Sequence, residues 1–249
     1  MPVVDLHTHS SFSDGTSSPE EVVHAALKSG VQIFALTDHD TMQGTEQAHA
    51  LATECKLRFV YGVEISTKEH DHLHFTAYNI DPKNSAFQDF LQANRQARIG
   101  RIEQVIRQLQ EAGVTITRED VFSRAGNTIS RAHVADALKA KKLAPSRQEA
   151  FCRFLVPGKP GYVSPIGVGA VEAITQIKKA GGLAVIAHPG MVSEIWNFPV
   201  WKEAGLDGIE VFYPAHSFTM RQDLLSLADK YGLFATAGSD YHGPKGNRT

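Results

Sequence analysis

The sequence predicts an α/β protein with an inserted, mainly helical segment. Short apolar runs of strand length alternate with segments in which apolar residues recur at helical spacing, as in proteins whose parallel strands are covered by helices. Residues 85–155 depart from this alternation, because they show helical spacing without a clear strand. We therefore expect a main part built from residues 1–84 and 156–249, and an inserted helical part over residues 85–155.

Seven strands are expected from the apolar runs. They are Val3–Leu6, Ile33–Leu36, Arg58–Val63, Leu73–Tyr78, Leu183–Ala187, Gly208–Phe212 and Leu233–Ala237. The first helix has a clear start signal, with Ser18 as N-cap, Pro19 in the first turn and Glu21 completing a capping box. It should run to about Ser29, where Gly30 can end it.

The inserted part is distinguished by its charge. The chain of 249 residues carries a net charge of -2, yet residues 91–160 contain 13 basic and six acidic residues, a net of +7, and the remainder carries -9. A basic helical face can look toward an anionic neighbour, or it can be an ordinary solvated surface. The near-neutral whole argues against a protein dedicated to long duplex nucleic acid.

Cysteine content and the N-terminus bear on location. The two cysteines, Cys55 and Cys152, lie far apart and form no C-x-x-C pair, so neither a disulfide framework nor a thiolate metal site is expected. No secretory signal is visible, and no apolar run approaches the roughly 18 residues of a membrane span. We expect a cytoplasmic protein that is not inserted in a membrane.

Histidines and carboxylates cluster where the expected strands end. His7 and His9 are two residues apart after the first strand, so their side chains share one side. Comparable positions are those of His39, Glu64, His72, His74, His188, Asp240 and His242. Ligands of parallel α/β proteins bind beyond the carboxyl ends of the strands, so these side chains should converge. Imidazole with carboxylate and no thiolate suits zinc, manganese or iron, which predicts a metal centre.

Five ordered motifs carry a family resemblance. They are His7-Thr-His9, Thr37-Asp-His39-Asp, Gly62-Val-Glu64, Ala187-His188-Pro and Gly238-Ser-Asp240-Tyr-His242. Together they resemble the motifs of the polymerase and histidinol phosphatase (PHP) family, over residues 5–243. The resemblance implies a distorted (β/α)7 barrel whose two- or three-metal centre hydrolyses phosphate esters.

The same resemblance implies a ligand set for two or three divalent ions (Mn, Zn, Fe or Mg). The first ion would be held by His7, His9, Glu64 and Asp240, the second by His74 and His188 with Glu64 bridging, and the third by Asp14, His39 and His242. Many relatives carry histidine at the position of Asp14. Because carboxylate is a harder ligand, the third site should prefer manganese or magnesium, or fill only weakly.

The expected chemistry follows from charge. Two or three divalent ions outweigh the three carboxylates, so the loaded site attracts an anion and can present a hydroxide to phosphorus. The catalytic candidates besides the metals are His39, which is also a ligand, and its neighbours Asp38 and Asp40. Asp38, Asp40 or a metal-bound water could protonate the leaving group, and the sequence does not choose among them.

A second motif bears on the substrate. Ser130-Arg131-Ala132-His133 in the insertion resembles the Ser-Arg-Pro-His helix start of the subgroup that removes phosphate from nucleoside 3′,5′-bisphosphates and trims short RNAs from the 5′ end. Ser130 can cap a helix, and Arg131 with His133 would hold a second phosphate. Arg124 is a weaker candidate for the same role, and His216, which follows a strand, is a further candidate for contacting substrate. Alternatively, Arg131 merely packs on the surface.

The leading hypothesis is therefore a metal-dependent phosphoesterase acting on nucleoside 3′,5′-bisphosphates, or also on short oligonucleotides from the 5′ end. One rival is histidinol phosphate phosphatase, which has no need for the basic insertion. A second rival is a non-catalytic metal-binding accessory domain, which the intact ligand set argues against. A third is an amidohydrolase, for which no lysine at a strand end is available to bridge metals.

Overall fold

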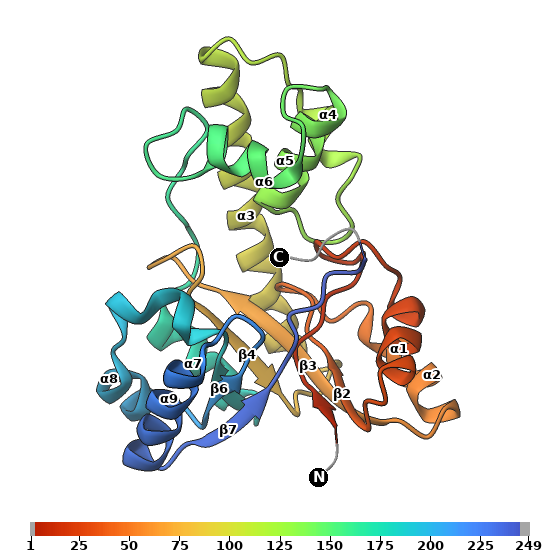
Figure 1. The fold of residues 1–249 in the computed structure, drawn as a ribbon, viewed down its shortest axis with the longest axis vertical. Helices are drawn as coiled ribbons and strands as arrows, with labels where there is room; N and C mark the ends of the chain where they lie inside the picture. Colours follow the sequence, from red (N-terminus) through yellow and green to blue (C-terminus); the bar gives the residue numbers. More distant parts are fainter. Residues whose placement is uncertain (1–2, 245–249) are drawn as a thin grey trace.

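A computed structural model describes residues 3–244 and shows one sheet of seven strands in sequential order. The strands are β1 (Val4–Asp5), β2 (Ile33–Leu36), β3 (Arg58–Ser66), β4 (His74–Tyr78), β5 (Leu183–Ile186), β6 (Gly208–Phe212) and β7 (Phe234–Ala237). Each predicted strand is present; the bounds of β2 and β6 are as predicted, and those of the other five strands differ by one to three residues. The sheet forms the lower body in Figure 1.

The two edges of the sheet meet beyond β1 and β7. The backbone N–H of Leu6 donates to the carbonyl of Ala237 at 2.9 Å, and Thr8 forms a parallel bridge with Tyr241. Because these contacts join the first strand to the last, the sheet closes into an irregular barrel. This confirms the predicted α/β fold with a distorted seven-stranded barrel.

The fourth strand differs from the parallel arrangement that was expected. Strand β4 runs antiparallel to both β3 and β5, whereas the other neighbouring pairs are parallel. Only residues 67–73 connect β3 to β4, and so short a connection cannot carry a parallel crossover. The reversal places His74, the first residue of β4, at the barrel end where the other strands finish.

Helices cover the outside of the barrel, as Figure 1 shows. They are α1 (Pro19–Lys28), α2 (Thr45–Glu54), α7 (Ala170–Lys179), the 3-10 segment η2 (Pro189–Ile195), α8 (Phe198–Ala204) and α9 (Phe218–Tyr231). The predicted start of α1 is confirmed, because Ser18 and Glu21 form both hydrogen bonds of the capping box. Ser29 caps its other end.

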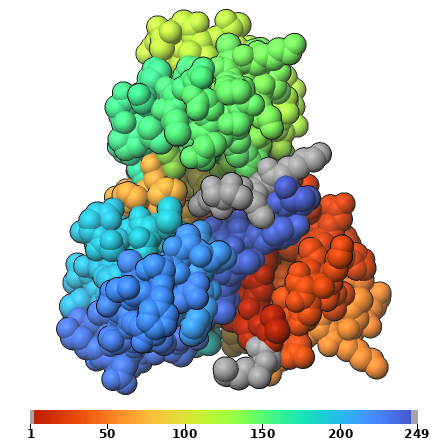
Figure 2. Space-filling view, in the orientation of Figure 1, coloured from red at the N-terminus to blue at the C-terminus, as the bar shows by residue number. Residues whose placement is uncertain are grey.

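The segment between β4 and α7 is helical, as expected. It holds α3 (Ser85–Glu111), α4 (Arg118–Phe122), α5 (Arg131–Ala140), α6 (Arg147–Ala150) and the π-helical turn η1 (Phe151–Leu155). These helices pack around a separate cluster of buried apolar residues that runs from Ile102 to Val163. Figure 2 shows them as a lobe above the barrel.

Helix α3 connects the two parts. Phe87 and Leu91, near its start, pack into the barrel core, whereas Ile102 and Leu109 belong to the core of the lobe. We propose that residues 85–155 form an inserted subdomain, with α3 as the rigid element that fixes the lobe over the barrel. In the described residues, no helix is long and apolar enough to cross a membrane.

Candidate metal centre

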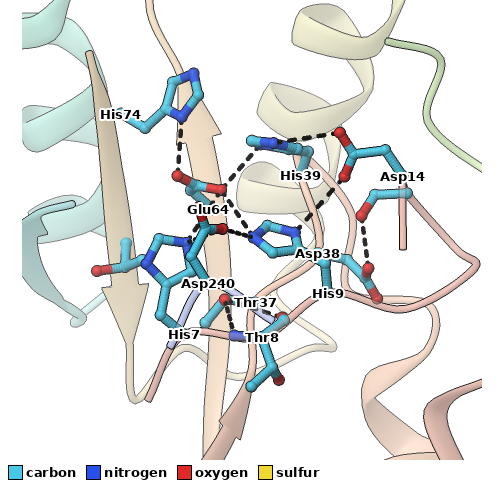
Figure 3. A network of polar contacts seen from close by, with 12 residues as sticks. His7, Thr8, His9, Asp14, Thr37, Asp38, His39, Glu64, His74 and Asp240 are labelled. Atoms are coloured by element: carbon cyan, nitrogen blue, oxygen red, sulfur yellow. Dashed lines mark hydrogen bonds and ion pairs between the residues drawn. The ribbon is translucent and has the colours of Figure 1, made fainter. Parts of the chain in front are cut away.

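A group of buried histidines and carboxylates occupies the barrel end that faces the lobe (Figure 3). Eight of the members lie at or just beyond strand ends, as the sequence predicted, and Asp14 lies in the loop before α1. They are His7, His9, Asp14, His39, Glu64, His74, His188, Asp240 and His242. All nine residues have less than 7% of their surface exposed, so no bulk water screens their charges.

Glu64 lies at the centre of this group, between His74 on one side and His7 and His9 on the other (Figure 3). Both of its carboxylate oxygens face imidazole nitrogens. The distances to Oε2 are 3.3 Å from His7 Nε2, 3.2 Å from His9 Nε2 and 3.1 Å from His39 Nδ1, and those to Oε1 are 2.8 Å from His74 Nδ1 and 3.0 Å from His188 Nε2. A single carboxylate in this position can bridge two ions.

Asp14 and Asp240 are the other two carboxylates of the group. Asp14 Oδ1 lies 3.2 Å from His242 Nε2 and 3.9 Å from His9 Nδ1, and its Oδ2 lies 3.8 Å from His39 Nε2. Asp240 Oδ1 lies 3.1 Å from His9 Nε2. His9 therefore has Asp14 at Nδ1, and both Asp240 and Glu64 at Nε2.

The donor atoms fall into three overlapping sets in which all atoms lie within 4.8 Å of one another. The sets are His7, His9, Glu64 and Asp240; His39, Glu64 and His74; and His9, Asp14, His39 and His242. Several of these buried atoms have no hydrogen-bond partner among the described residues, including His7 Nε2, both nitrogens of His9, Glu64 Oε2 and His242 Nε2. Buried polar atoms without partners are costly, and divalent ions would satisfy them together. The residues present therefore fit a metal centre.

The charges of the group are tightly coupled. Burial alone would lower the pKa of His7, but the carboxylates of Glu210 and Glu64 outweigh it and hold this pKa well above its usual value. Burial is likewise outweighed at His9, where the neighbouring carboxylates of Asp240 and Glu64 raise the pKa to about 9. Conversely, the surrounding histidines hold the pKa of Glu64 well below its usual range despite burial. Protons and metal ions thus compete for the same atoms.

Glu210, in β6, supports this group and was missed in the sequence. Its Oε1 lies 3.0 Å from His7 Nδ1, and its Oε2 accepts the backbone N–H of His188 at 2.6 Å. Gly238 makes this contact possible, because a Cβ there would collide with Glu210 and with the side chain of His7. A lone carboxylate within the apolar run Gly208–Phe212 was the available signal.

Comparisons with known proteins agree with this geometry. The family model for the PHP domain matches residues 5–99. A 3′,5′-nucleoside bisphosphate phosphatase from Chromobacterium violaceum is 36% identical over 98% of this chain and 88% of its own length. The chain belongs to the PHP family. The family expected from the five motifs is therefore confirmed.

Other PHP relatives are similar over the same extent. A 5′-3′ exoribonuclease from Haemophilus influenzae is 34% identical over 97% of this chain and 90% of its own length. Among solved structures, a protein from Bifidobacterium adolescentis, predicted to be a metal-dependent phosphoesterase, superposes with a TM-score of 0.91 at 32% identity. That match covers all of this chain and 90% of the other. The inserted lobe is thus included in the similarity.

Asp38 and Asp40 flank the PHP histidine His39, but both carboxylates are occupied elsewhere. Asp38 accepts from the backbone N–H of Ser10 at 2.7 Å and from the hydroxyls of Ser10 and Ser13 at 2.6 Å each. Asp40 accepts from Asn94 and Arg98 of α3 at 2.6 Å each. These contacts give Asp38 a role in holding the loop before Asp14, and give Asp40 a role in joining the barrel to the lobe. The proposed proton-donor role of either residue has no support in these contacts.

The lobe brings Ser130 and Arg131 to the metal centre. Ser130 caps α5 and its hydroxyl lies 3.3 Å from Asp14 Oδ2. Arg131 contacts Asp71 Oδ2 at 2.9 Å and donates to the carbonyl of Leu155 at 3.1 Å. Both residues line an opening above His39 and His74. We call this opening the phosphate pocket; its lining also includes Asp14, Ser66, Asp71, Arg98, Arg101 and Phe151.

The three remaining substrate candidates lie elsewhere. His133 and Arg124 line a different opening, and His133 Nδ1 accepts the backbone N–H of Ser130 at 3.0 Å as part of the α5 cap. Both ring nitrogens of His216 contact backbone groups, the carbonyl of Val211 at 3.0 Å and the N–H of Gly190 at 3.1 Å. His216 therefore positions the backbone after β5 and has no ring nitrogen left for substrate.

Proposed function

We propose that this PHP protein is a metal-dependent phosphoesterase that hydrolyses the 3′-phosphate of nucleoside 3′,5′-bisphosphates, and that it also trims short 5′-phosphorylated RNA from the 5′ end. The observation that carries the proposal is the position of Arg101 and Arg131 in the pocket directly above the cluster around Glu64. Two guanidinium groups beside a metal centre suit a substrate with two phosphates.

The pocket side chains prepare these guanidinium groups for an anion. Asp71 Oδ1 lies 2.6 Å from Arg101 Nη2 while its Oδ2 contacts Arg131, so one carboxylate orients both arginines. The guanidinium carbon of Arg131 lies 5.5 Å from the ring centre of Phe151, which offers an apolar surface beside the phosphate site. A nucleoside 5′-phosphate can thus be bound through its phosphate and its base.

The nine buried residues would hold the ions as the family resemblance implies. His7, His9, Glu64 and Asp240 would hold the first ion, His74 and His188 with Glu64 the second, and Asp14, His39 and His242 the third. Divalent ions bound there supply Lewis acidity that activates water and neutralises phosphate charge. Glu64 and Asp240 hold the imidazoles of His7 and His9 in place, and Glu210 orients His7 from behind. Ser130, which contacts Asp14, lines the phosphate pocket together with the arginines and can donate to a phosphate oxygen.

The names of the relatives support both activities, since the Chromobacterium protein is a bisphosphate phosphatase and the Haemophilus protein a 5′-3′ exoribonuclease. The substrate partners we propose are small phosphorylated nucleotides and short oligonucleotides. Cys55 and Cys152 are exposed and free, which fits the reducing cytoplasm proposed as its location.

Phosphate release from adenosine 3′,5′-bisphosphate, compared with AMP and with histidinol phosphate in the presence of manganese, tests the proposal. Bound metals are measured on the same preparation by elemental analysis. We expect strong preference for the bisphosphate. Turnover of histidinol phosphate alone would agree with the proposed metal centre but contradict the proposed substrate. Bound metal without hydrolysis of any of the three compounds would favour a non-catalytic accessory role.

A further inference from the structure

A second opening reaches Asp14 of the metal centre. It is lined by Ser11, Gly15 and Thr16 of the loop around Asp14, and by Arg124, His133, Asp136, Lys139 and Arg147 of the lobe. We call this opening the groove. Asp14 belongs to the lining of both the groove and the phosphate pocket, so the two openings meet at this ligand.

The groove is cationic. Lys139 is exposed near the end of α5 and forms no ion pair with any described residue. Arg124 is also exposed, and its Nε donates to the backbone carbonyl of Asp120 at 3.0 Å, which leaves its charge uncompensated there. Arg147 is the exception, because it pairs with Asp136 through two contacts of 2.9 and 2.5 Å. Burial lowers the pKa of His133, so this ring adds no charge of its own at neutral pH.

The two openings share the carboxylate that faces His39 and His242. Asp14 Oδ2 lies 3.3 Å from the hydroxyl of Ser130 and 3.8 Å from Nε2 of His39, both of which line the phosphate pocket, and Asp14 also lines the groove beside Gly15 and Thr16. A phosphorus atom at the metal centre can therefore carry one substituent toward the pocket and another toward the groove. A bisphosphate nucleotide needs only the first of these paths.

We propose that the groove binds the chain on the 3′ side of the scissile phosphate when the substrate is an oligonucleotide. This inference rests on the proposed function and adds a second binding surface to it. The first nucleotide lies in the phosphate pocket with its 5′-phosphate on Arg101 and Arg131, and Lys139 and Arg124 contact phosphates of the following nucleotides.

The chemistry is the same for both substrates. Water oxygen bonds to phosphorus, the P–O3′ bond of the first nucleotide breaks, and O3′ leaves with a proton. With a bisphosphate the products are a nucleoside 5′-monophosphate and inorganic phosphate. With an oligonucleotide the phosphorus also carries the O5′ of the next nucleotide, so the shortened chain keeps a 5′-phosphate. That end group is the one the phosphate pocket binds, so the product is again a substrate.

The test compares Lys139→Glu with Lys142→Glu, a matched control that reverses an exposed charge three residues away and outside the groove. The substrates are adenosine 3′,5′-bisphosphate and a 5′-phosphorylated adenylate trinucleotide. Because a reversed charge repels a backbone phosphate, we expect Lys139→Glu to lower kcat/KM for the trinucleotide about tenfold at low salt. Activity on the bisphosphate should stay unchanged, and Lys142→Glu should leave both activities unchanged.

A binding measurement with metal-free protein gives a readout that does not depend on turnover. The affinity for the same trinucleotide is followed against salt concentration. Loss of one phosphate contact should weaken binding and reduce the salt slope by about 0.7.

The outcomes separate this inference from the proposed function. Equal losses on both substrates, or unchanged trinucleotide binding and cleavage in Lys139→Glu, would overturn the groove. Wild-type protein that hydrolyses the bisphosphate and leaves the trinucleotide intact would overturn it as well. If the wild-type protein hydrolyses neither substrate, the proposed function is contradicted. The binding measurement alone would then test whether the groove binds the oligonucleotide.

Discussion

Glu210 Oε1 lies 3.0 Å from Nδ1 of His7, the ring nitrogen opposite the one that faces Glu64. A carboxylate at Nδ1 favours the proton there, so Nε2 is the nitrogen that would be offered to a metal ion in the cluster. The same carboxylate accepts the backbone N–H of His188, whose φ of 31° is left-handed. One buried side chain of β6 thus orients two of the expected ligands.

Replacing Glu210 by Gln should weaken metal binding without removing a ligand. The amide has the same shape but can no longer hold His7 by charge, and losses of about 10- to 100-fold in affinity are typical for such partners. Metal titration by calorimetry measures the effect. Glu203→Gln, an exposed glutamate of α8, is the control. Equal affinities in the two variants would contradict the role given to Glu210.

Removing the metals should lower thermal stability. The buried nitrogens and oxygens without partners around His9 and Glu64 would lose the ions that satisfy them. An ion present at 100 times its dissociation constant stabilises the fold by about 2.7 kcal/mol, which is roughly 5–10 °C in Tm for a chain of this size. Calorimetric scans with and without a chelator check this.

The matched control for metal removal is Glu64→Ala, which lacks the central carboxylate of the cluster. Its Tm should respond to the chelator much less than that of the wild type, because two of the three sets of donor atoms include Glu64. If the chelator does not change the Tm of the wild-type protein, the cluster holds no stabilising ion.

Much of the barrel could be predicted because its strands are short apolar runs bounded by turn residues, and because local chemistry sets their ends. The capping box of Ser18 and Glu21 is an example that depends on two residues three positions apart. The convergence of His7, His39 and Glu64 followed from one topological rule about strand ends.

The features that the sequence did not reveal depend on tertiary pairing. Alternation along β4 carries no direction, so its antiparallel course followed only from the short connection before it. Glu210 sits in an apolar strand, and its face is set by the register with β7. Arg131 and His133 are two residues apart in the sequence, yet α5 directs them into different openings.

Asp38 is expected to act by holding the loop that carries Asp14. Replacing Asp38 by Asn turns one acceptor into a donor that faces Ser10 and Ser13, which should cost about 1–3 kcal/mol of stability. Urea unfolding measures the loss. A displaced Asp14 loop should also lower the rate of phosphate release. Ser13→Ala removes one of the same hydrogen bonds and should reproduce part of both losses.

The two variants distinguish positioning from proton donation by Asp38. If Asp38 were the general acid, Asp38→Asn would abolish one limb of the pH–rate profile while Ser13→Ala left activity intact. A positioning role predicts that the pH–rate profiles of both variants keep the shape of the wild-type profile, with a lower rate at every pH.

The lobe should depend on its own core. Leu138 of α5 is fully buried among the apolar residues of the lobe, and truncation to Ala should cost about 2–5 kcal/mol. Because the metal ligands lie in the barrel, metal binding should persist in this variant while hydrolysis of the bisphosphate is lost. Hydrogen exchange locates the destabilised region. Exchange that rises equally in barrel strands would show that the two parts unfold as one unit.

Arg131 should govern the preference for a second phosphate. Its largely buried guanidinium is held by Asp71 in the phosphate pocket, and a hydrogen bond to a charged group contributes about 1.5–3 kcal/mol. Arg131→Ala should therefore raise KM for adenosine 3′,5′-bisphosphate by roughly 10- to 100-fold. Because 3′-AMP lacks the 5′-phosphate, its KM should barely change.

Asp71→Asn keeps the arginine but loosens its orientation, so it should show a smaller rise in KM with the same substrate dependence. Equal effects of Arg131→Ala on both nucleotides would mean that this arginine stabilises the lobe rather than binding the 5′-phosphate.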